Sequence, residues 1–217
     1  MKKIPLIPLS TPDMLDFEMN APKIIRKSEY KRATWKNGLG FTDEIAIHPE
    51  GASLAKGDFQ WRLSSARIES ASPFSMFPAH DRVLVILRGN GIRMAHRYEE
   101  GDPEEINEVG PLEPYEFPGD IQSRCELMKG AITDFSVFTE TGRIGAQVTV
   151  QELSPDEDFV WNSEGRWNFA FAIDRSIDTD AGALLEGDTL SCGPGEVRLT
   201  AGGEGAKLLL VSLEALG

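Results

Sequence analysis

Short runs in which apolar and polar residues alternate dominate the chain. Apolar side chains recur at every second position over residues 144–150 and again over residues 167–173, a period of two that is typical of β-strands. Residues 83–87 are apolar without a break, as in a strand that is buried on both faces. Glycine and proline separate such runs at intervals of about 8–12 residues, which favours a sandwich or barrel. The pattern therefore predicts an all-β fold.

Two glycine-rich turns predict hairpins. The sequence Gly-Asn-Gly at residues 89–91 separates two strand patterns, and Gly-Gly-Glu-Gly at residues 202–205 separates two others. Glycine and asparagine accept the positive φ angles of tight hairpin turns. We therefore expect the strands on either side of each turn to pair with one another.

The strand patterns fall into two groups, which predict two barrels in one chain. We place the first barrel at residues 23–140 and a second, smaller barrel at residues 141–217. Residues 1–22 form an N-terminal arm. Because the second group is short for a complete barrel, we expect the arm to supply it with a strand, which would also protect an edge.

The composition limits the partners and the location of the protein. A net charge of −13 over 217 residues repels duplex nucleic acid unless a basic patch is set apart. The basic cluster over residues 23–36 lacks the regular aromatic interleaving of a single-strand binder, so we expect no nucleic-acid partner. The chain contains no apolar run long enough to span a membrane, and its N-terminus lacks the apolar core of a secretory signal. We expect a cytoplasmic protein without a membrane partner.

The histidines do not form a recognisable metal site. His48, His80 and His96 are the three in the chain, and none forms the His-x-His pair that a convergent ligand set would need. We therefore expect neither a metal nor another cofactor. His80 precedes Asp81 at the start of a predicted strand, so a general acid or base role for His80 with Asp81 or Glu44 is the alternative. This alternative describes a metal-independent isomerase or hydrolase acting on a sugar or amino-acid derivative.

Arg62, helped by Arg82, is the strongest candidate for binding the carboxylate of a ligand. Strand alternation places Arg62 and Ser64 on one face, where a guanidinium and a hydroxyl would line a barrel together. Arginine binds carboxylates through paired hydrogen bonds. The opposing interpretation is that Arg62 braces neighbouring strands by pairing with Glu44 or Asp81. Arg82 leaves the same two interpretations open.

Other polar and aromatic residues of the same region complete the candidate pocket. Asn37 precedes a Gly-Leu-Gly turn, whose glycines permit tight backbone geometry. Aromatic side chains nearby would form an apolar wall, although Phe77 fits a core position better. The ligand-binding residues predicted from the sequence are Trp35, Asn37, Thr42, Arg62, Ser64, Phe74, Ser75 and Arg82.

Five segments between residues 23 and 142 resemble the HutD/Ves family of bicupins in order and spacing. They read WKNGLGFTDEI, FQWRLSSARI, SPFSMFPAHDRVLVILRGNG, YEFPGD and ITDFSVFTETG. The resemblance implies two double-stranded β-helix (cupin) barrels in one chain. It also implies a regulatory or accessory role in histidine utilisation, with a carboxylate ligand such as urocanate or a formylated or formiminated glutamate. No catalytic activity follows from it.

The chain departs from the family pattern at several positions. Leu39 stands where the family tends to have a glycine, and Ser136, Glu140 and Thr141 replace an asparagine and a later pair of arginines. If these positions face the pocket, the ligand differs from that of relatives. Because cupin barrels often pair through edge strands, a homodimer is a further expectation.

Overall fold

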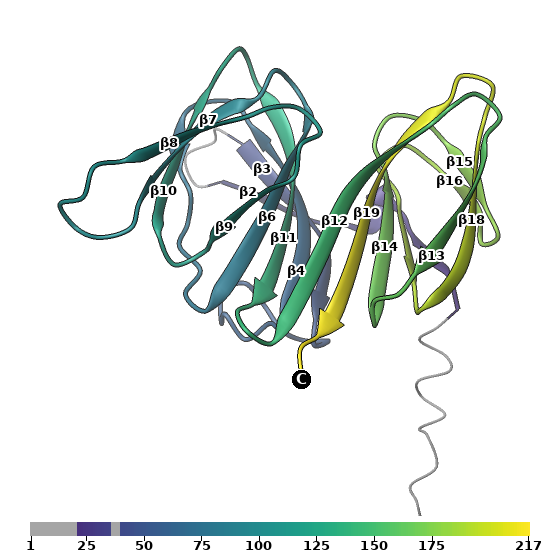
Figure 1. Ribbon diagram of the computed structural model, residues 1–217, viewed down its shortest axis with the longest axis horizontal. Helices are drawn as coiled ribbons and strands as arrows, with labels where there is room; N and C mark the ends of the chain where they lie inside the picture. Colours follow the sequence, from purple (N-terminus) through teal and green to yellow (C-terminus); the bar gives the residue numbers. More distant parts are fainter. Residues whose placement is uncertain (1–20, 36–39) are drawn as a thin grey trace, which may run out of the picture.

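The computed structural model describes residues 21–35 and 40–217. These residues form strands β1 to β19 and one short 3₁₀ helix, η1 (Lys27–Glu29), as the alternating pattern predicts. The strands build two barrels that lie side by side (Figure 1). Within the described residues there is no helix long and apolar enough to cross a membrane.

The first barrel consists of two facing sheets. One has six strands in the order β2-β3-β4-β11-β6-β9, and the other has four in the order β5-β10-β7-β8. Their bounds are β2 (Lys31–Thr34), β3 (Gly40–His48), β4 (Trp61–Ile68), β5 (Ser72–Pro73), β6 (His80–Arg88), β7 (Ile92–Arg97), β8 (Glu105–Val109), β9 (Tyr115–Pro118), β10 (Gln122–Leu127) and β11 (Ile132–Glu140).

The second barrel repeats this plan with nine strands. Its sheets have the orders β1-β17-β14-β19-β12 and β13-β18-β15-β16. Their bounds are β1 (Lys23–Ile25), β12 (Ile144–Leu153), β13 (Asp158–Ser163), β14 (Trp167–Ala172), β15 (Ile177–Thr179), β16 (Gly182–Leu184), β17 (Thr189–Cys192), β18 (Gly195–Ala201) and β19 (Ala206–Ala215).

The two predicted hairpins are wrong in their pairing, although all four flanking segments are strands. β6 pairs with β11 and β9, whereas β7 pairs with β10 and β8. Similarly, β18 pairs with β13 and β15, whereas β19 pairs with β12 and β14. Each glycine-rich turn carries the chain from one sheet of a barrel to the other. Turn residues fix a local reversal, but they do not decide which strands share hydrogen bonds.

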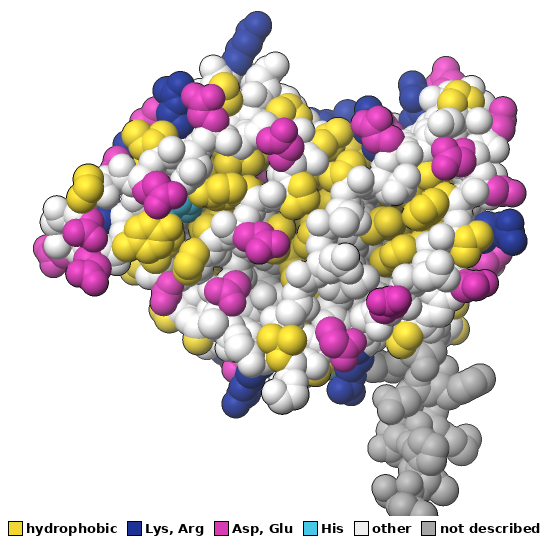
Figure 2. Space-filling view, in the orientation of Figure 1, with side chains coloured by type: hydrophobic (Ala, Val, Ile, Leu, Met, Phe, Trp, Pro, Cys, Tyr) yellow, Lys and Arg dark blue, Asp and Glu magenta, His cyan; other side chains and the backbone are white. Residues whose placement is uncertain are grey.

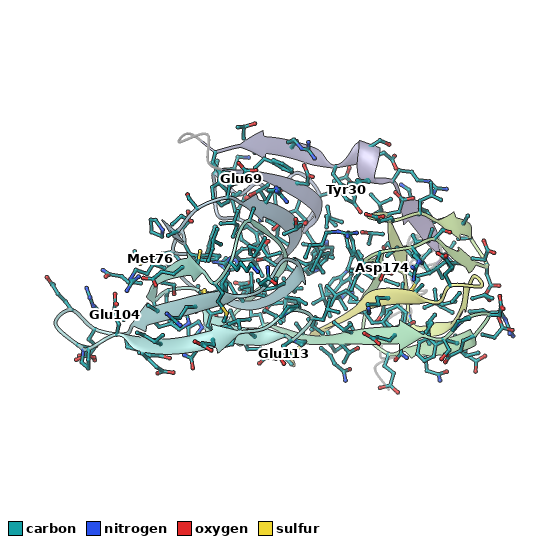
Figure 3. All side chains as sticks on the ribbon, turned by 90° about the horizontal axis from the view of Figure 1, so that it is seen from above. Tyr30, Glu69, Met76, Glu104, Glu113 and Asp174 are labelled. Carbon is teal, nitrogen blue, oxygen red and sulfur yellow. The ribbon has the colours of Figure 1, made fainter. Side chains whose placement is uncertain are left out.

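The boundary predicted at residue 23 also needs correction. β1 pairs with β17, so residues 23–25 belong to the second barrel. The chain then crosses through η1 to β2, the edge strand of the first barrel. Tyr30 anchors this crossing, since its hydroxyl donates a hydrogen bond to the Gly187 carbonyl at 2.8 Å and lies 2.7 Å from Thr189 Oγ1. Figure 3 shows Tyr30 between the two barrels. Residues 1–20 of the predicted arm lie outside the described residues.

An apolar core joins the two barrels, and each barrel also has an inner core. Successive side chains of a strand point to opposite faces, so one strand contributes both to the shared core and to an inner core. On β4, Leu63 faces the second barrel, whereas Ile68 faces the interior of the first. On β11, Phe135 packs edge-to-face against Phe171 of the second barrel, with the ring centroids 5.2 Å apart. The continuous apolar run at residues 83–87 is buried because one face lines the barrel and the other meets its neighbour.

Charged side chains cover the outside of both barrels. Figure 2 shows acidic side chains scattered over one face, with hydrophobic side chains visible between them. Many basic side chains are paired in ionic networks on this exterior. Arg124, for example, binds both carboxylate oxygens of Glu104 at 3.2 and 2.7 Å. The charged positions of greatest interest are the few that lie inside the first barrel.

Candidate functional site

The interior of the first barrel contains a cavity of about 480 Å³. Alternate residues of β4, β6 and β11 point into it, because every second side chain of a strand lies on the same face. Apolar side chains fill the rest of the inner core, so the polar ones gather at the cavity. The cavity-lining residues from these three strands are Arg62, Ser64, Ala66, Ile68, Arg82, Asp134, Ser136 and Phe138.

Arg82 places a buried cation in the cavity among aromatic rings. Its side chain lies on β6, and the residue is 5% exposed. Its guanidinium carbon lies 4.4 to 5.9 Å from four ring centroids, close enough for cation–π attraction. Those rings belong to Phe74, Phe77, Phe117 and Phe138. Burial lowers the pKa of Arg82 to about 10, so it remains charged at neutral pH.

Arg82 has unused hydrogen-bonding capacity. Within the described residues, its Nε has no hydrogen-bond partner and no carboxylate lies within 4.0 Å of its guanidinium. The hydroxyl of Ser136 is a distant acceptor, 3.4 Å from Nη2. A buried guanidinium without a paired anion is costly, because desolvation of a charge is not compensated by aromatic faces alone. An anionic ligand would supply the missing partner.

Arg62 both braces the sheet and lines the cavity. Its Nε donates a hydrogen bond to Glu44 Oε2 at 2.8 Å, and its Nη1 donates one to Ser64 Oγ at 3.0 Å. The interpretation that Arg62 braces neighbouring strands is confirmed with Glu44 as its partner, and Arg62 lies at the cavity as well. Because Glu44 neutralises Arg62, Arg82 is the cation of the cavity that has no ion-pair partner among the described residues.

Asp134 is the acidic residue among the described residues that line the cavity. It lies on β11 opposite Ala66 of β4, and its Oδ1 accepts a hydrogen bond from the Ala66 backbone N–H at 3.0 Å. Only 2% of the residue is exposed. Burial raises the pKa of Asp134 to about 7, and the charge of Arg82 opposes this effect only partly. The carboxyl group therefore exchanges a proton near neutral pH.

An aromatic wall closes one side of the cavity. The indole N–H of Trp35 donates a hydrogen bond to Thr42 Oγ1 at 2.9 Å, which fixes the ring. Gly40 lies beneath this ring, and a Cβ there would meet the Trp35 ring and the Arg67 carbonyl. Glycine at this position thus leaves room for the Trp35 ring beside the cavity.

The structure brings together nearly all of the predicted ligand-binding residues. Those that line the cavity are Trp35, Thr42, Arg62, Ser64, Phe74, Ser75 and Arg82. Asn37 and the family departure at Leu39 lie outside the described residues. The departure at Ser136 does line the cavity, whereas Glu140 pairs with Arg143 at 3.2 Å and is not among the lining residues.

Four lining residues that bear on the chemistry of the cavity are not among the ligand-binding residues predicted from the sequence. Phe77 was predicted to be core, and it lines the cavity instead. Asp134, Ser136 and Phe138 alternate along β11 and share its inner face. Their spacing of two was the available signal, but choosing the inner face required knowing which neighbours β11 packs against.

His80 does not reach the cavity. Its ring nitrogens lie 2.8 Å from the Phe59 carbonyl oxygen and 3.1 Å from the Pro78 carbonyl oxygen. The ring also stacks on Phe59, with centroids 4.2 Å apart. Both nitrogens are thus directed at the backbone, and His80 is absent from the cavity lining. This placement gives the acid–base alternative no support.

A second histidine is likewise held by its neighbours. His96 lies between Ser123 Oγ and Tyr115 Oη, each 2.8 Å from a ring nitrogen, and burial lowers its pKa. Among residues 21–35 and 40–217, there is no group of three or more His, Cys, Asp or Glu side chains placed to hold a metal ion.

The family model described as HutD matches residues 27–209. The chain belongs to the HutD family. A curated relative from Pseudomonas putida is named as an uncharacterized 21.2 kDa protein in the hutC 3′ region, and it is 35% identical over 130 residues. That match covers 60% of this chain and 64% of the relative. The HutD assignment confirms the resemblance that the five sequence segments show.

Two solved structures of Pseudomonas proteins are similar over 91% of this chain and the whole of theirs. One is a conserved protein of unknown function from Pseudomonas aeruginosa PAO1, with 28% identity and a TM-score of 0.74. The other is HutD from Pseudomonas fluorescens SBW25 in a formate condition, with 27% identity and a TM-score of 0.71.

A more distant structure confirms the type of fold. The bacterial pirin YhhW from Escherichia coli, solved with nickel(II), covers 88% of this HutD protein with a TM-score of 0.63 and 9% identity. At this identity the likeness concerns the fold alone. The two barrels are cupins, and the chain is a bicupin.

Proposed function

We propose that this HutD protein binds a small carboxylate metabolite in its first barrel. The observation that carries the proposal is the buried Arg82 guanidinium, which lacks a carboxylate partner among the described residues and borders a cavity of about 480 Å³. Small-ligand sites are typically cavities of about 300–1,000 Å³ with apolar walls and few polar anchors. Arg82 binds the carboxylate, and Trp35 and Phe74 supply the wall.

The surrounding side chains define what the ligand must offer. The Ser64 hydroxyl and the Arg62 guanidinium already form a hydrogen bond with each other. Their remaining hydrogen-bonding groups are left to bind a second polar group of the ligand. A carboxylate joined to a planar or amide-like body therefore fits this lining. Urocanate and formylated or formiminated glutamate have this composition. The second barrel shows the contrast, because Ala170 and Ala172 of β14 lie in an apolar inner core.

We further propose an accessory or regulatory role in histidine utilisation. The support is the family membership and the hutC-region name of the Pseudomonas putida relative. Binding without turnover agrees with a site where His80, the histidine considered as an acid or base, is engaged elsewhere.

Titration calorimetry with urocanate, N-formylglutamate and their methyl esters tests the proposal. We expect at least one free acid to bind and to raise the melting temperature, since a ligand of the native state stabilises it by mass action. The matching ester should bind at least about tenfold more weakly, because it lacks the charge that Arg82 pairs with. Equal affinity for acid and ester would remove Arg82 from the recognition of the ligand.

A further inference from the structure

Among the described residues, three charged or ionisable side chains line the cavity of the first barrel, and Glu44 lies behind one of them, so that four charges act on the cavity. Glu44 neutralises Arg62 through a 2.8 Å ion pair. Arg82 and Asp134 both line the same cavity, yet within the described part of the chain they form no ion pair with each other or with another residue. When Asp134 is ionised, these four charges sum to zero. When Asp134 is protonated, the cavity has one positive charge.

The backbone holds Asp134 in the cavity. Asp134 faces the cavity because it lies two residues from Ser136 on the inner face of β11. The Ala66 N–H then fixes Oδ1 at 3.0 Å. Because the carboxyl group is tethered, it cannot withdraw to solvent when a ligand enters.

The neighbouring strands contribute other titratable groups. Facing Asp134 are Arg82 from β6 and Arg62 from β4, with Glu44 of β3 behind Arg62, and Cys125 from β10. Burial raises the pKa of the Cys125 thiol and lowers the pKa of Arg82 to about 10. The thiol therefore stays neutral and the guanidinium stays charged near pH 7. Burial raises the pKa of Asp134 to about 7.

A ligand carboxylate and an ionised Asp134 would compete for the same cation. Both would carry negative charge in a cavity from which the ligand expels water, where charges interact more strongly than in solvent. A protonated Asp134 removes this repulsion, and its O–H becomes a hydrogen-bond donor. The cavity then presents donors from Arg82, Arg62 and Asp134, which suit a ligand rich in acceptors.

We propose that the first barrel takes up its carboxylate ligand together with one proton, which Asp134 accepts from solvent. The inference rests on the proposed function and adds a pH control to it. Ligand binding then weakens as the pH rises through neutrality, because ionisation of Asp134 cancels the positive charge that attracts the carboxylate. The ligand class is a monocarboxylate, or a dicarboxylate whose second acid group remains at the mouth of the cavity.

Calorimetry in buffers of different ionisation enthalpy measures this proton uptake directly. The probes are N-formylglutamate and cinnamate, whose carboxyl groups do not titrate between about pH 5.5 and 8.5. We expect about half a proton taken up per ligand at pH 7, approaching one at pH 8, and an affinity that falls about tenfold from pH 6 to pH 8, as linkage to one group requires. The wild-type measurement is sufficient by itself and needs no variant to fold.

Two variants test whether Asp134 is the group that accepts the proton. Asp134→Asn keeps the Oδ1 acceptor for Ala66 but cannot ionise, so its affinity should be independent of pH and its proton uptake zero. The control Asp43→Asn removes a carboxylate of β3 that pairs with Arg32 and does not line the cavity. This control should keep the wild-type pH dependence.

The outcomes separate the inference from the proposed function. Binding without proton uptake, at an affinity that is constant from about pH 6 to pH 8, would overturn the inference and leave carboxylate binding intact. The same pH dependence in Asp134→Asn as in the wild type would also overturn it. Absence of binding of every carboxylate at every pH would overturn both.

Discussion

Replacing Arg82 with methionine is expected to abolish carboxylate binding while the protein remains folded. The change removes the Arg82 guanidinium and keeps a long apolar side chain among the surrounding rings. Loss of a charge-assisted contact in a buried site costs about 2–4 kcal/mol, or about 30- to 1,000-fold in affinity. Arg82 forms no ion pair among the described residues, so its removal breaks none. Asp134 loses the neighbouring charge that lowers its pKa, so it becomes protonated rather than remaining a buried anion. Calorimetry and urea denaturation measure the two effects separately.

Arg62→Met is the matched control for this prediction. Arg62 is also a buried arginine of the same cavity, but its removal leaves the Glu44 carboxylate without its ion-pair partner. We therefore expect Arg62→Met to lower the free energy of unfolding by about 2–3 kcal/mol, less than for a fully buried pair because Glu44 is partly exposed. If Arg82→Met kept wild-type affinity, or if it lost as much stability as Arg62→Met, the assignment of the free cation would be wrong.

Phe135→Ala is expected to cause the largest loss of stability. Phe135 is fully buried, and its ring packs against Phe171 across the contact between the barrels. Truncating a buried phenylalanine costs about 3–5 kcal/mol, from lost burial and from the cavity that remains. Because the shared core contains side chains from both barrels, we expect both barrels to be destabilised in one transition. Urea unfolding, monitored in parallel by tryptophan fluorescence and by circular dichroism, shows whether there is one transition.

Ile106→Ala is the control for the core substitution. Ile106 lies on edge strand β8 and is 57% exposed, so its truncation should change the free energy of unfolding by less than about 0.5 kcal/mol. Two separate transitions in Phe135→Ala, with the second barrel unaffected, would show that the barrels fold independently of their contact.

Strand alternation was sufficient to predict much of the candidate site. Arg62 and Ser64 are two residues apart, so their shared face followed from the period of a strand alone. The role of Asp134 was harder to predict. Both faces of β11 are buried, one by the cavity and one by the second barrel, so its pattern does not show which face is inside.

Strand pairing could not be predicted from local signals. The Gly-Asn-Gly turn fixes a reversal between β6 and β7, but the twist and closure of the barrel put them in different sheets. Likewise, β1 joins the second barrel through contacts with β17, residues more than a hundred positions away. Such pairings depend on tertiary packing, which a period of hydrophobicity does not encode.

A crystal structure of the protein with N-formylglutamate is the most direct measurement of where the ligand binds. We expect a ligand carboxylate oxygen within about 3 Å of an Arg82 nitrogen, inside the first barrel and beside Asp134. The proposal would be contradicted if the ligand occupied the smaller cavity of about 250 Å³ between the barrels, lined by Lys27, Arg32, Arg67 and Arg88, while the Arg82 cavity stayed empty.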